Sequence, residues 1–330
     1  MALHSIGGFR IVRPLPVHNT VSRLFLANKD EATSGAANSP AGAAGAEFVV
    51  KCLMPGEGEA HEIMTAQFEH EAQLMKAFSH PCIPTLHAHG SQDGVRFIVM
   101  DYIDGVDLAQ LLGHRDDETR GLSKELAVYM LGQLADAIRH LHTFEAPDAE
   151  GYLQPHPVLH RDINPSNIFL SRHGDVVLGD FGSAVSSWLA PEHAPKGAGT
   201  RAYMAPERIA GTGEATVQTD LFAMAVSLWE ILKGQRLFGE HDDLKVMDAI
   251  VRFDISHSSR RVSGLSPKLS EVLRRNLDRD PERRYPTAYK VLQRLAQSPE
   301  AAAAEQSRQE LAALVNEAAD EMWRSQNGKA

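Results

Sequence analysis

The feature that most constrains this chain is a short polar segment, His160–Asn167, which reads His-Arg-Asp-Ile-Asn-Pro-Ser-Asn. A short apolar stretch separates it from Asp180-Phe181-Gly182, and Ala205-Pro206-Glu207 follows. Two carboxylates and one carboxamide of these segments stand on short loops that bracket a predicted hairpin. Such oxygen atoms are good ligands for Mg²⁺. These three side chains can therefore hold magnesium ions against a polyphosphate.

The composition is that of an ordinary globular protein. The chain has 330 residues, of which 43% are hydrophobic and 23% charged, and this suits one large domain or a two-lobed unit. The net charge of -10 argues against broad binding to nucleic acid or anionic membranes. The two cysteines, Cys52 and Cys82, are too few for a disulfide framework or a thiolate metal site, and we expect buried, reduced thiols.

Neither a membrane span nor a leader peptide is expected from the sequence. No stretch approaches the ~20 apolar residues that a membrane-spanning helix needs. The N-terminus, Met1–His4, lacks a charged leader followed by an apolar run. We therefore expect a cytoplasmic protein with no membrane span.

Strands come first along the chain and helices later, which predicts an α+β arrangement of two lobes with a junction near residue 103. Apolar, β-branched runs predict the strands, and apolar residues at helical spacing predict a first helix over residues 61–78. The predicted strands are 9–12, 24–27, 48–53, 85–89 and 96–100, and the later helices include 124–142, 220–233 and 268–277.

Two insertions and a tail complete the predicted organisation. Residues 28–47 are a low-complexity insertion rich in Ala, Gly and Ser, and residues 143–157 are a second, loop-like insertion. In the tail, residues 298–330, several apolar side chains share one predicted helical face: Leu311, Leu314, Val315, Ala318, Met322 and Trp323. We expect this amphipathic helix to pack on its own lobe or to bind a partner.

The ordered motifs resemble those of eukaryotic-like serine/threonine protein kinases, over roughly residues 9–296. The resemblance implies a bilobal protein-kinase-like fold, with a small antiparallel-sheet N-lobe containing one main helix (1–103) and a larger helical C-lobe (104–297). It implies ATP-dependent phosphoryl transfer to serine or threonine hydroxyls of a protein substrate, with ATP and Mg²⁺, or Mn²⁺, as cofactors. It also implies a structural pair between Glu207 and Arg284, and a buried acid at Asp220.

The resemblance assigns the chemistry to three residues. Asp162 accepts the proton of the acceptor hydroxyl and orients its oxygen, and Asn167 and Asp180 bind the metal ions. Ordinary structural roles are the alternative: Asp162 could cap a turn, and Asp180 could be a loop acid.

The nucleotide-binding residues follow from the same resemblance. Lys51 matches the lysine that contacts the α- and β-phosphates, and Glu71 is its expected partner, with Glu69 as the alternative. Asp107 matches the acidic position near the ribose but equally suits a helix N-cap. The full set of expected nucleotide-binding residues is Lys51, Val17, Leu24, Val49, Met100, Asp101, Ile103, Asp107 and Phe169.

The phosphate-binding side departs from the family pattern in two places. Val17, Asn19 and Ser22 stand where three glycines would let backbone amides approach phosphates closely, so we expect weak ATP affinity. Asn164 stands where a lysine is usual, and losing that charge would slow transfer by ~10²–10³-fold.

The segment after Asp180 is also unusual. Residues Trp188–Gly199 contain no Ser, Thr or Tyr that could be phosphorylated. Thr200 matches the family threonine that contacts the catalytic aspartate.

Two other functions stay open at this point. A pseudokinase, acting as a nucleotide-binding scaffold, is supported by the missing glycines and by Asn164. A small-molecule phosphotransferase would share the spacing of acid and asparagine, but Glu207 with Arg284 speaks against it. Histidines are numerous, yet none forms a pair with a third ligand at zinc-like spacing.

Overall fold

The computed structural model describes residues 4–16, 22–30, 47–113, 121–194, 197–239, 242–255 and 262–327. The chain divides into two compact units. The N-terminal unit comprises the residues up to Ser79 together with Pro84–Tyr102 and Leu189–Ala194. The C-terminal unit comprises His80–Ile83, Ile103–Trp188 and the residues after Ala194.

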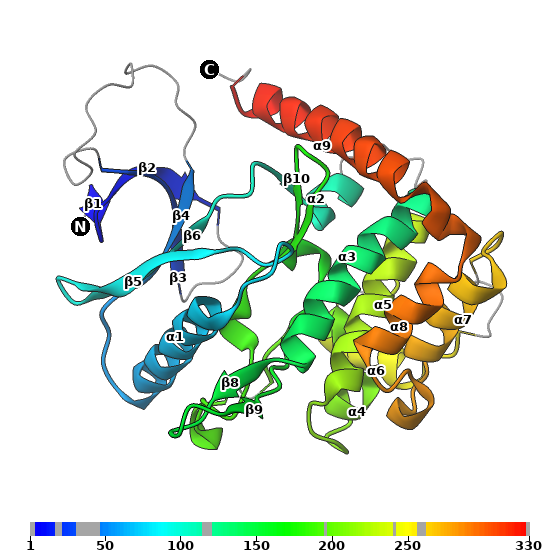
Figure 1. Cartoon of the computed structure of the whole chain (residues 1–330), viewed down its shortest axis with the longest axis horizontal. Helices are drawn as coiled ribbons and strands as arrows, with labels where there is room; N and C mark the ends of the chain where they lie inside the picture. The colour runs from blue at the N-terminus through cyan, green and yellow to red at the C-terminus, as the bar shows by residue number, and fades with distance from the viewer. Residues whose placement is uncertain are drawn as a thin grey trace. The chain divides into compact units, whose positions relative to one another are not determined.

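The N-terminal unit is built on a six-stranded antiparallel sheet (Figure 1). In sheet order the strands are β1 (Ser5–Ile6), β2 (Phe9–Leu15), β3 (Ser22–Lys29), β4 (Phe48–Leu53), β6 (Val95–Asp101) and β5 (Leu86–Gln92). The β5–β6 hairpin turns at Asp93 and Gly94, which both have positive φ (51° and 79°). A two-residue type I′ turn requires this geometry and favours Asp-Gly, so the sequence specifies the turn.

The two faces of this sheet have different partners. Side chains alternate between faces along a strand. One face carries the hydrophobic cluster of the unit, which includes Phe9, Ala27, Val50, Cys52, Phe97 and Val99. Lys51 therefore lies on the other face, where it meets Glu71 of helix α1 (Glu59–Ala77).

The C-terminal unit is mainly helical, with α5 (Val217–Lys233) in its core. Every residue of α5 from Thr219 to Ile231 is buried, as expected for a helix that is enclosed on all sides. The other helices are α2 (Leu108–Gly113), α3 (Lys124–His142), α4 (Pro206–Ile209), α6 (Asp243–Val251), α7 (Pro267–Asn276), α8 (Ala288–Ala296) and α9 (Ala304–Asn327). At the start of α3, Ser123 Oγ accepts a hydrogen bond from the amide of Leu126 (3.2 Å).

Two small sheets belong to this unit. The strands β7 (Gly105–Asp107), β10 (Ile168–Ser171) and β11 (Val176–Leu178) form one sheet in the order β11-β10-β7. The other is a hairpin of β8 (Glu145–Pro147) and β9 (Leu153–Pro155). The prediction of a loop over 143–157 was therefore wrong. The Asp148 carboxylate closes the hairpin turn by accepting hydrogen bonds from the amides of Glu150 and Tyr152, and three-residue strands with terminal prolines have little sequence signal.

Two further sequence predictions need correction. The predicted insertion 28–47 begins too early, because Asn28 and Lys29 belong to β3 and pair with β2; residues 31–46 lie outside the described part. In α9, Leu311, Val315 and Ala318 are buried as predicted, but Trp323 is 66% exposed. At 3.6 residues per turn, Trp323 lies about 120° around the helix from Leu311, so it does not share that face.

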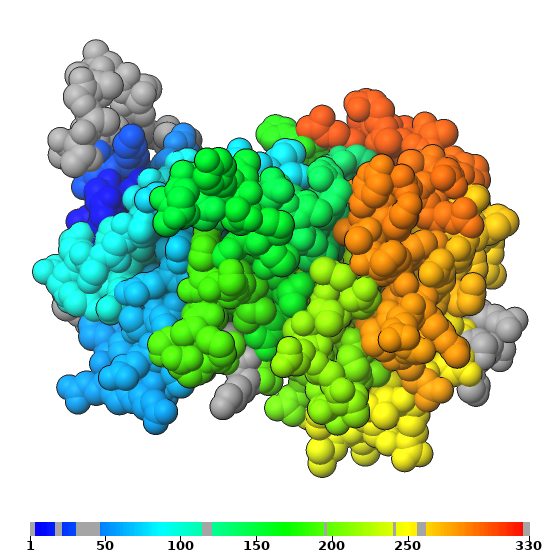
Figure 2. Space-filling model, turned by 60° about the horizontal axis from the view of Figure 1, so that its bottom comes forward, coloured from blue at the N-terminus to red at the C-terminus, as the bar shows by residue number. Residues whose placement is uncertain are grey.

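The tail helix α9 is part of the C-terminal unit and contacts α3; Figure 1 shows α9 crossing the top of this unit. Figure 2 shows the orange segment that carries α8 continuing into the red-orange tail on one surface of this unit. Among the helices that the structure describes, none is long and apolar enough to cross a membrane.

Candidate active site

Three hydrogen bonds fix the carboxylate of Asp162. Its Oδ1 accepts from the amide of Thr200 (2.7 Å) and from Nδ2 of Asn164 (2.9 Å). Its Oδ2 accepts from Nδ2 of Asn167 (3.1 Å). Four residues that the sequence singled out are therefore in one cluster, in which the carboxylate of Asp162 is the common acceptor.

Asn164 has a local structural role in this cluster. It is buried, and its Oδ1 accepts a hydrogen bond from the amide of Ser166 at the start of the 3₁₀ turn Pro165–Asn167 (2.9 Å). Its Nδ2 also donates to Thr200 Oγ1 (3.2 Å). An amide side chain donates and accepts, whereas a lysine only donates. Asn164 thus ties the turn to Asp162 and to Thr200.

Asn167 and Asp180 lie at the same end of the β10–β11 hairpin. Asn167 directly precedes β10, Asp180 follows β11 by two residues, and the Gly179 amide donates to the Asn167 carbonyl (2.9 Å). Asp180 has a φ of 60°, a left-handed conformation that costs a non-glycine residue about 1–3 kcal/mol. Next to it, Phe181 is buried and packs on His160. One amide and one carboxylate side chain therefore stand at one end of a short hairpin.

The buried carboxylate of Asp220 holds the backbone at the start of the segment His160–Asn167. Asp220, at the start of α5, accepts hydrogen bonds from the amides of His160 (3.0 Å) and Arg161 (2.9 Å). Asp220 is buried, as predicted. It also accepts a hydrogen bond from Nε2 of His142 (2.8 Å), which no feature of the sequence predicted. Burial alone would raise the pKa of Asp220, yet the hydrogen bond from His142 and the neighbouring donors hold that pKa below its ordinary value.

In the N-terminal unit, Lys51 and Glu71 form a buried ion pair. Lys51 Nζ lies 2.8 Å from both Oε1 and Oε2 of Glu71. The two side chains are 9% and 2% exposed. The alternative partner, Glu69, instead pairs with Arg96 at the surface (2.9 Å).

Three of the expected nucleotide-binding residues of this unit share the sheet face of Lys51. Val49 stands two residues before Lys51 on β4 and pairs with Met100 of β6, while Leu24 of β3 pairs with Lys51 itself. Because side chains alternate along strands, all four belong to one face. Val17 lies outside the described residues, as does Asn19.

The other expected nucleotide-binding residues have contacts of their own. Asp101 ends β6, and its amide donates to the carbonyl of Thr85 (3.1 Å). Ile103 is half-buried and begins the next part of the C-terminal unit. Phe169 on β10 pairs in register with Asp107 on β7. The helix N-cap foreseen as an alternative for Asp107 is present, because its Oδ1 accepts from the Gln110 amide in α2 (2.7 Å).

The segment after Asp180 is fixed by contacts that the sequence analysis missed. In the C-terminal unit, Trp188 stacks on His156 with ring centroids 4.1 Å apart, and Ser187 Oγ lies 2.9 Å from His156 Nδ1. In the N-terminal unit, Gln67 Nε2 donates to the carbonyl of His193 (2.9 Å). Gln67 precedes Glu71 by four residues and so shares its helix face, a signal that could have identified it. His156 lies within the predicted insertion, where no pattern pointed to it.

We expect His156 to make stability pH-dependent. Burial lowers its pKa, so between that lowered pKa and the ordinary imidazole value of about 6.5 the unfolded chain binds a proton that the folded chain does not. The contribution of His156 to the free energy of unfolding is therefore complete above about pH 6.5 and is lost as the pH falls. Melting temperatures at about pH 7.5 and about pH 5.5 should differ less in His156→Asn than in the wild type. Burial also lowers the pKa of His140, so part of the decrease in melting temperature should remain in both proteins. An equal decrease in the wild type and in His156→Asn would contradict the expectation.

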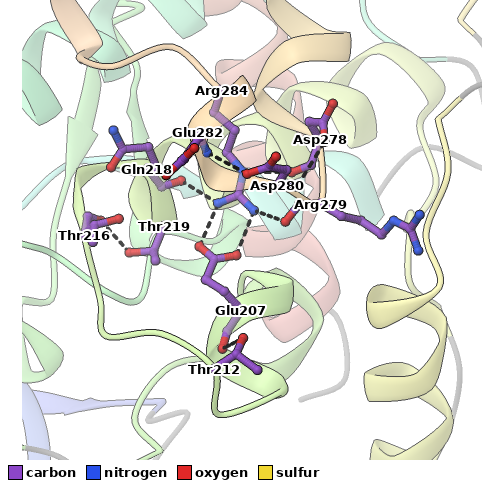
Figure 3. Close-up of polar contacts among 10 residues, drawn as sticks. All are labelled: Glu207, Thr212, Thr216, Gln218, Thr219, Asp278, Arg279, Asp280, Glu282 and Arg284. Atoms are coloured by element: carbon purple, nitrogen blue, oxygen red, sulfur yellow. Dashed lines mark hydrogen bonds and ion pairs between the residues drawn. The ribbon is translucent and has the colours of Figure 1, made fainter.

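The predicted structural pair between Glu207 and Arg284 is confirmed (Figure 3). Arg284 donates to both carboxylate oxygens of Glu207 at 2.8 Å. It also donates to the carbonyls of Gln218, Asp278 and Arg279. Its guanidinium is fully buried, so it is satisfied by fixed partners in place of water.

The cysteines and the possible metal-binding clusters were also considered as functional groups in the sequence. Both cysteines are buried and free, as predicted, and burial raises the pKa of Cys52 to about 11 and that of Cys82 to about 12. Within the described residues, no three His, Cys, Asp or Glu side chains are grouped to hold a metal ion.

Comparison with known proteins agrees with this geometry. Residues 38–295 match the family model of the protein kinase domain. The tyrosine-protein kinase MasK of Myxococcus xanthus is 34% identical over 223 residues, which cover 67% of this chain and 34% of MasK. The serine/threonine-protein kinase PrkC of Bacillus subtilis is 26% identical over 73% of this chain and 35% of its own length.

A third relative is the serine/threonine-protein kinase PknB of Mycolicibacterium smegmatis, 28% identical over 67% of this chain and 34% of its own length. The chain thus spans about a third of the length of the curated relatives that it matches. The antiparallel sheet with one main helix and the helical C-terminal unit agree with the bilobal kinase fold that the sequence predicted. Because the family model covers more than half of the sequence, the chain belongs to the protein kinase domain family.

Proposed function

We propose that this protein is an ATP-dependent protein kinase that phosphorylates serine or threonine hydroxyls of protein substrates. The observation that carries the proposal is the cluster in which Thr200, Asn164 and Asn167 fix the carboxylate of Asp162. The buried pair of Lys51 and Glu71 supports it, as do the relatives named as serine/threonine kinases.

In the proposed reaction Asp162 orients the acceptor hydroxyl and takes its proton. The hydroxyl oxygen forms a bond to the γ-phosphorus, and the bond from that phosphorus to the β–γ bridging oxygen breaks, so that ADP leaves. Lys51 contacts the α- and β-phosphates, and Glu71 holds its ammonium group in position. Because the transition state is loose, positioning and charge neutralisation carry most of the rate enhancement.

The residues at the end of the β10–β11 hairpin fit a magnesium ion. Asn167 uses its amide nitrogen on Asp162, so its amide oxygen is the atom to bind a metal ion. Asp180 adds a carboxylate, and Mg²⁺ prefers such hard oxygen ligands together with substrate phosphates. The ion would neutralise charge on the phosphates. Mn²⁺ takes the same ligands.

Metal removal tests this part. With excess EDTA we expect phosphoryl transfer to stop, and with restored Mg²⁺ or Mn²⁺ we expect it to return, because the phosphate charge is otherwise not neutralised. The measurement is transfer from labelled ATP to a generic basic protein. Undiminished transfer in EDTA would refute metal dependence.

The acceptor residue is the second point to test. The name of MasK as a tyrosine kinase favours tyrosine as an alternative acceptor. Phosphoamino-acid analysis of the labelled substrate separates the two, and we expect phosphoserine and phosphothreonine. Phosphotyrosine alone would overturn the proposed specificity, and absence of transfer with retained nucleotide binding would overturn kinase activity itself.

Asn164 gives a further prediction. Asn164→Ala removes the hydrogen bonds to Asp162 and Thr200 and the cap on Ser166. We expect kcat to fall by about 10–100-fold, since Asp162 loses one of the donors that orient it, while ATP affinity changes little. Steady-state kinetics at varied ATP measure both quantities, and an unchanged kcat would show that the amide is dispensable.

We assign residues 1–103 to the kinase N-lobe, 104–297 to the C-lobe and 298–330 to a C-terminal helical extension.

A further inference from the structure

Helix α9 begins after the last residue that matches the kinase family model, yet it is fastened to two strands that carry expected nucleotide-binding residues. We propose that α9 is a positioning element of the nucleotide site, acting through Arg172 on β7 and β10. This inference rests on the proposed function, because Asp107 and Phe169 are expected to contact ATP.

An apolar row seats the helix on its own unit. Leu311 and Val315 are fully buried and Ala318 is nearly so. The helix contacts α3, α2, β7 and β10. Burying three such side chains is favourable by roughly 0.8 kcal/mol per CH₂ group, so α9 is an integral part of the unit.

Arg172 connects the helix to both strands. It directly follows β10, and its amide donates to the carbonyl of Asp104, the residue directly before β7 (2.8 Å). Its Nη1 donates to Asn316 Oδ1 (2.7 Å) and pairs with Asp320 (3.1 Å), both on α9. In return, Asn316 Nδ2 donates to the backbone carbonyl of Arg172 (3.1 Å). The helix therefore holds both the side chain and the main chain of this residue.

A second attachment lies at the turn between β10 and β11. Arg308 of α9 donates to Asp175 (2.9 Å), which accepts a bond from Ser171 Oγ at the end of β10 (2.7 Å). Gly174 in this turn has a φ of +81°, and a Cβ there would collide with the carbonyl oxygen of Arg308. The turn and the helix backbone are thus in close contact.

These attachments act on very short strands. β7 has three residues and β10 has four. Phe169 lies opposite Asp107 in their register, and Ser171 lies opposite Gly105. The bond from Arg172 to Asp104 adds one more link beyond that last pair. A sheet of three such short strands gains stability from packing against a helix, so the helix that holds Arg172 also fixes the positions of Phe169 and Asp107.

The test compares nucleotide affinity in Asn316→Ala and Arg172→Ala with the wild type, in the full chain. Calorimetric titration with Mg-ADP gives Kd, and steady-state kinetics give KM for ATP and kcat. We expect Kd and KM to rise by about three- to tenfold and kcat at saturating ATP to stay within twofold or so. A purely structural role would lower the melting temperature and leave Kd unchanged. The control is Arg252→Ala, which removes an exposed ion pair with Asp248 on α6 and should change neither constant.

The outcomes separate this inference from the proposed function. Weaker Mg-ADP binding by both variants supports the inference even if the wild type transfers no phosphate. Wild-type Kd and KM in both variants would overturn it, whether or not the protein is a kinase. A wild type that fails to bind nucleotide would overturn both.

Discussion

Replacing Asp162 with asparagine should reduce phosphoryl transfer by about 10²–10⁴-fold, the usual contribution of a general base. The amide introduced by Asp162→Asn would keep the shape of the side chain but could not take the proton of the acceptor hydroxyl. Its single amide oxygen would still accept from Thr200 and Asn164, which share Oδ1, while the bond from Asn167 to Oδ2 would be lost. The loss should therefore be in kcat, with ATP affinity nearly unchanged.

The measurement is transfer of labelled phosphate from Mg-ATP to a basic protein, beside a thermal shift with Mg-ADP for each protein. The nucleotide-induced shift of Asp162→Asn should match that of the wild type. Transfer by Asp162→Asn at the wild-type rate would remove Asp162 from the mechanism and leave the proposed assignment without its central residue.

The largest effect on stability is expected for Glu207→Ala. Arg284 would then keep its charge in a fully buried position after losing both of its bonds to the carboxylate. Removing one partner of a buried ion pair typically costs about 3–5 kcal/mol of unfolding free energy. The backbone carbonyls that remain around Arg284 offset only part of this cost, because they carry no full charge.

Denaturant unfolding measures the effect as a lower midpoint at an unchanged m-value. The matched control is Arg283→Ala, which removes a neighbouring arginine whose pair with Asp280 is exposed (3.4 Å). It should cost at most about 1 kcal/mol. If Glu207→Ala were no more destabilising than Arg283→Ala, the buried pair would not be a main support of the C-terminal unit.

Local sequence patterns predicted the regular elements well. The bounds of β4 and of α3 agree with the prediction residue for residue, because an apolar run broken only by Lys51 and a strong helical periodicity leave few alternatives. Motif spacing also selected Glu71 over Glu69 as the partner of Lys51, as the distances show. The general kinase fold followed from these elements and the order of the motifs.

Contacts between distant segments could not be predicted in the same way. His156 meets Trp188 far along the chain, and Arg172 meets Asn316 across 144 positions. No periodicity or motif joins such pairs, so only the folded chain reveals them. The role of Asn164 was missed for another reason. Its position was compared with a lysine that points at phosphate, whereas its amide is used on Asp162, Thr200 and Ser166.

The division of the chain into units has a consequence for work with fragments. The chain passes from one unit to the other after Ser79, Ile83, Tyr102, Trp188 and Ala194, so neither unit is one continuous stretch. A fragment ending near residue 103 would lack Leu189–Ala194, and with it the carbonyl of His193 that Gln67 binds. Recombinant halves cut at the junction would therefore be incomplete. The N-terminal unit would be complete only if the C-terminal half supplied residues Leu189–Ala194 to it.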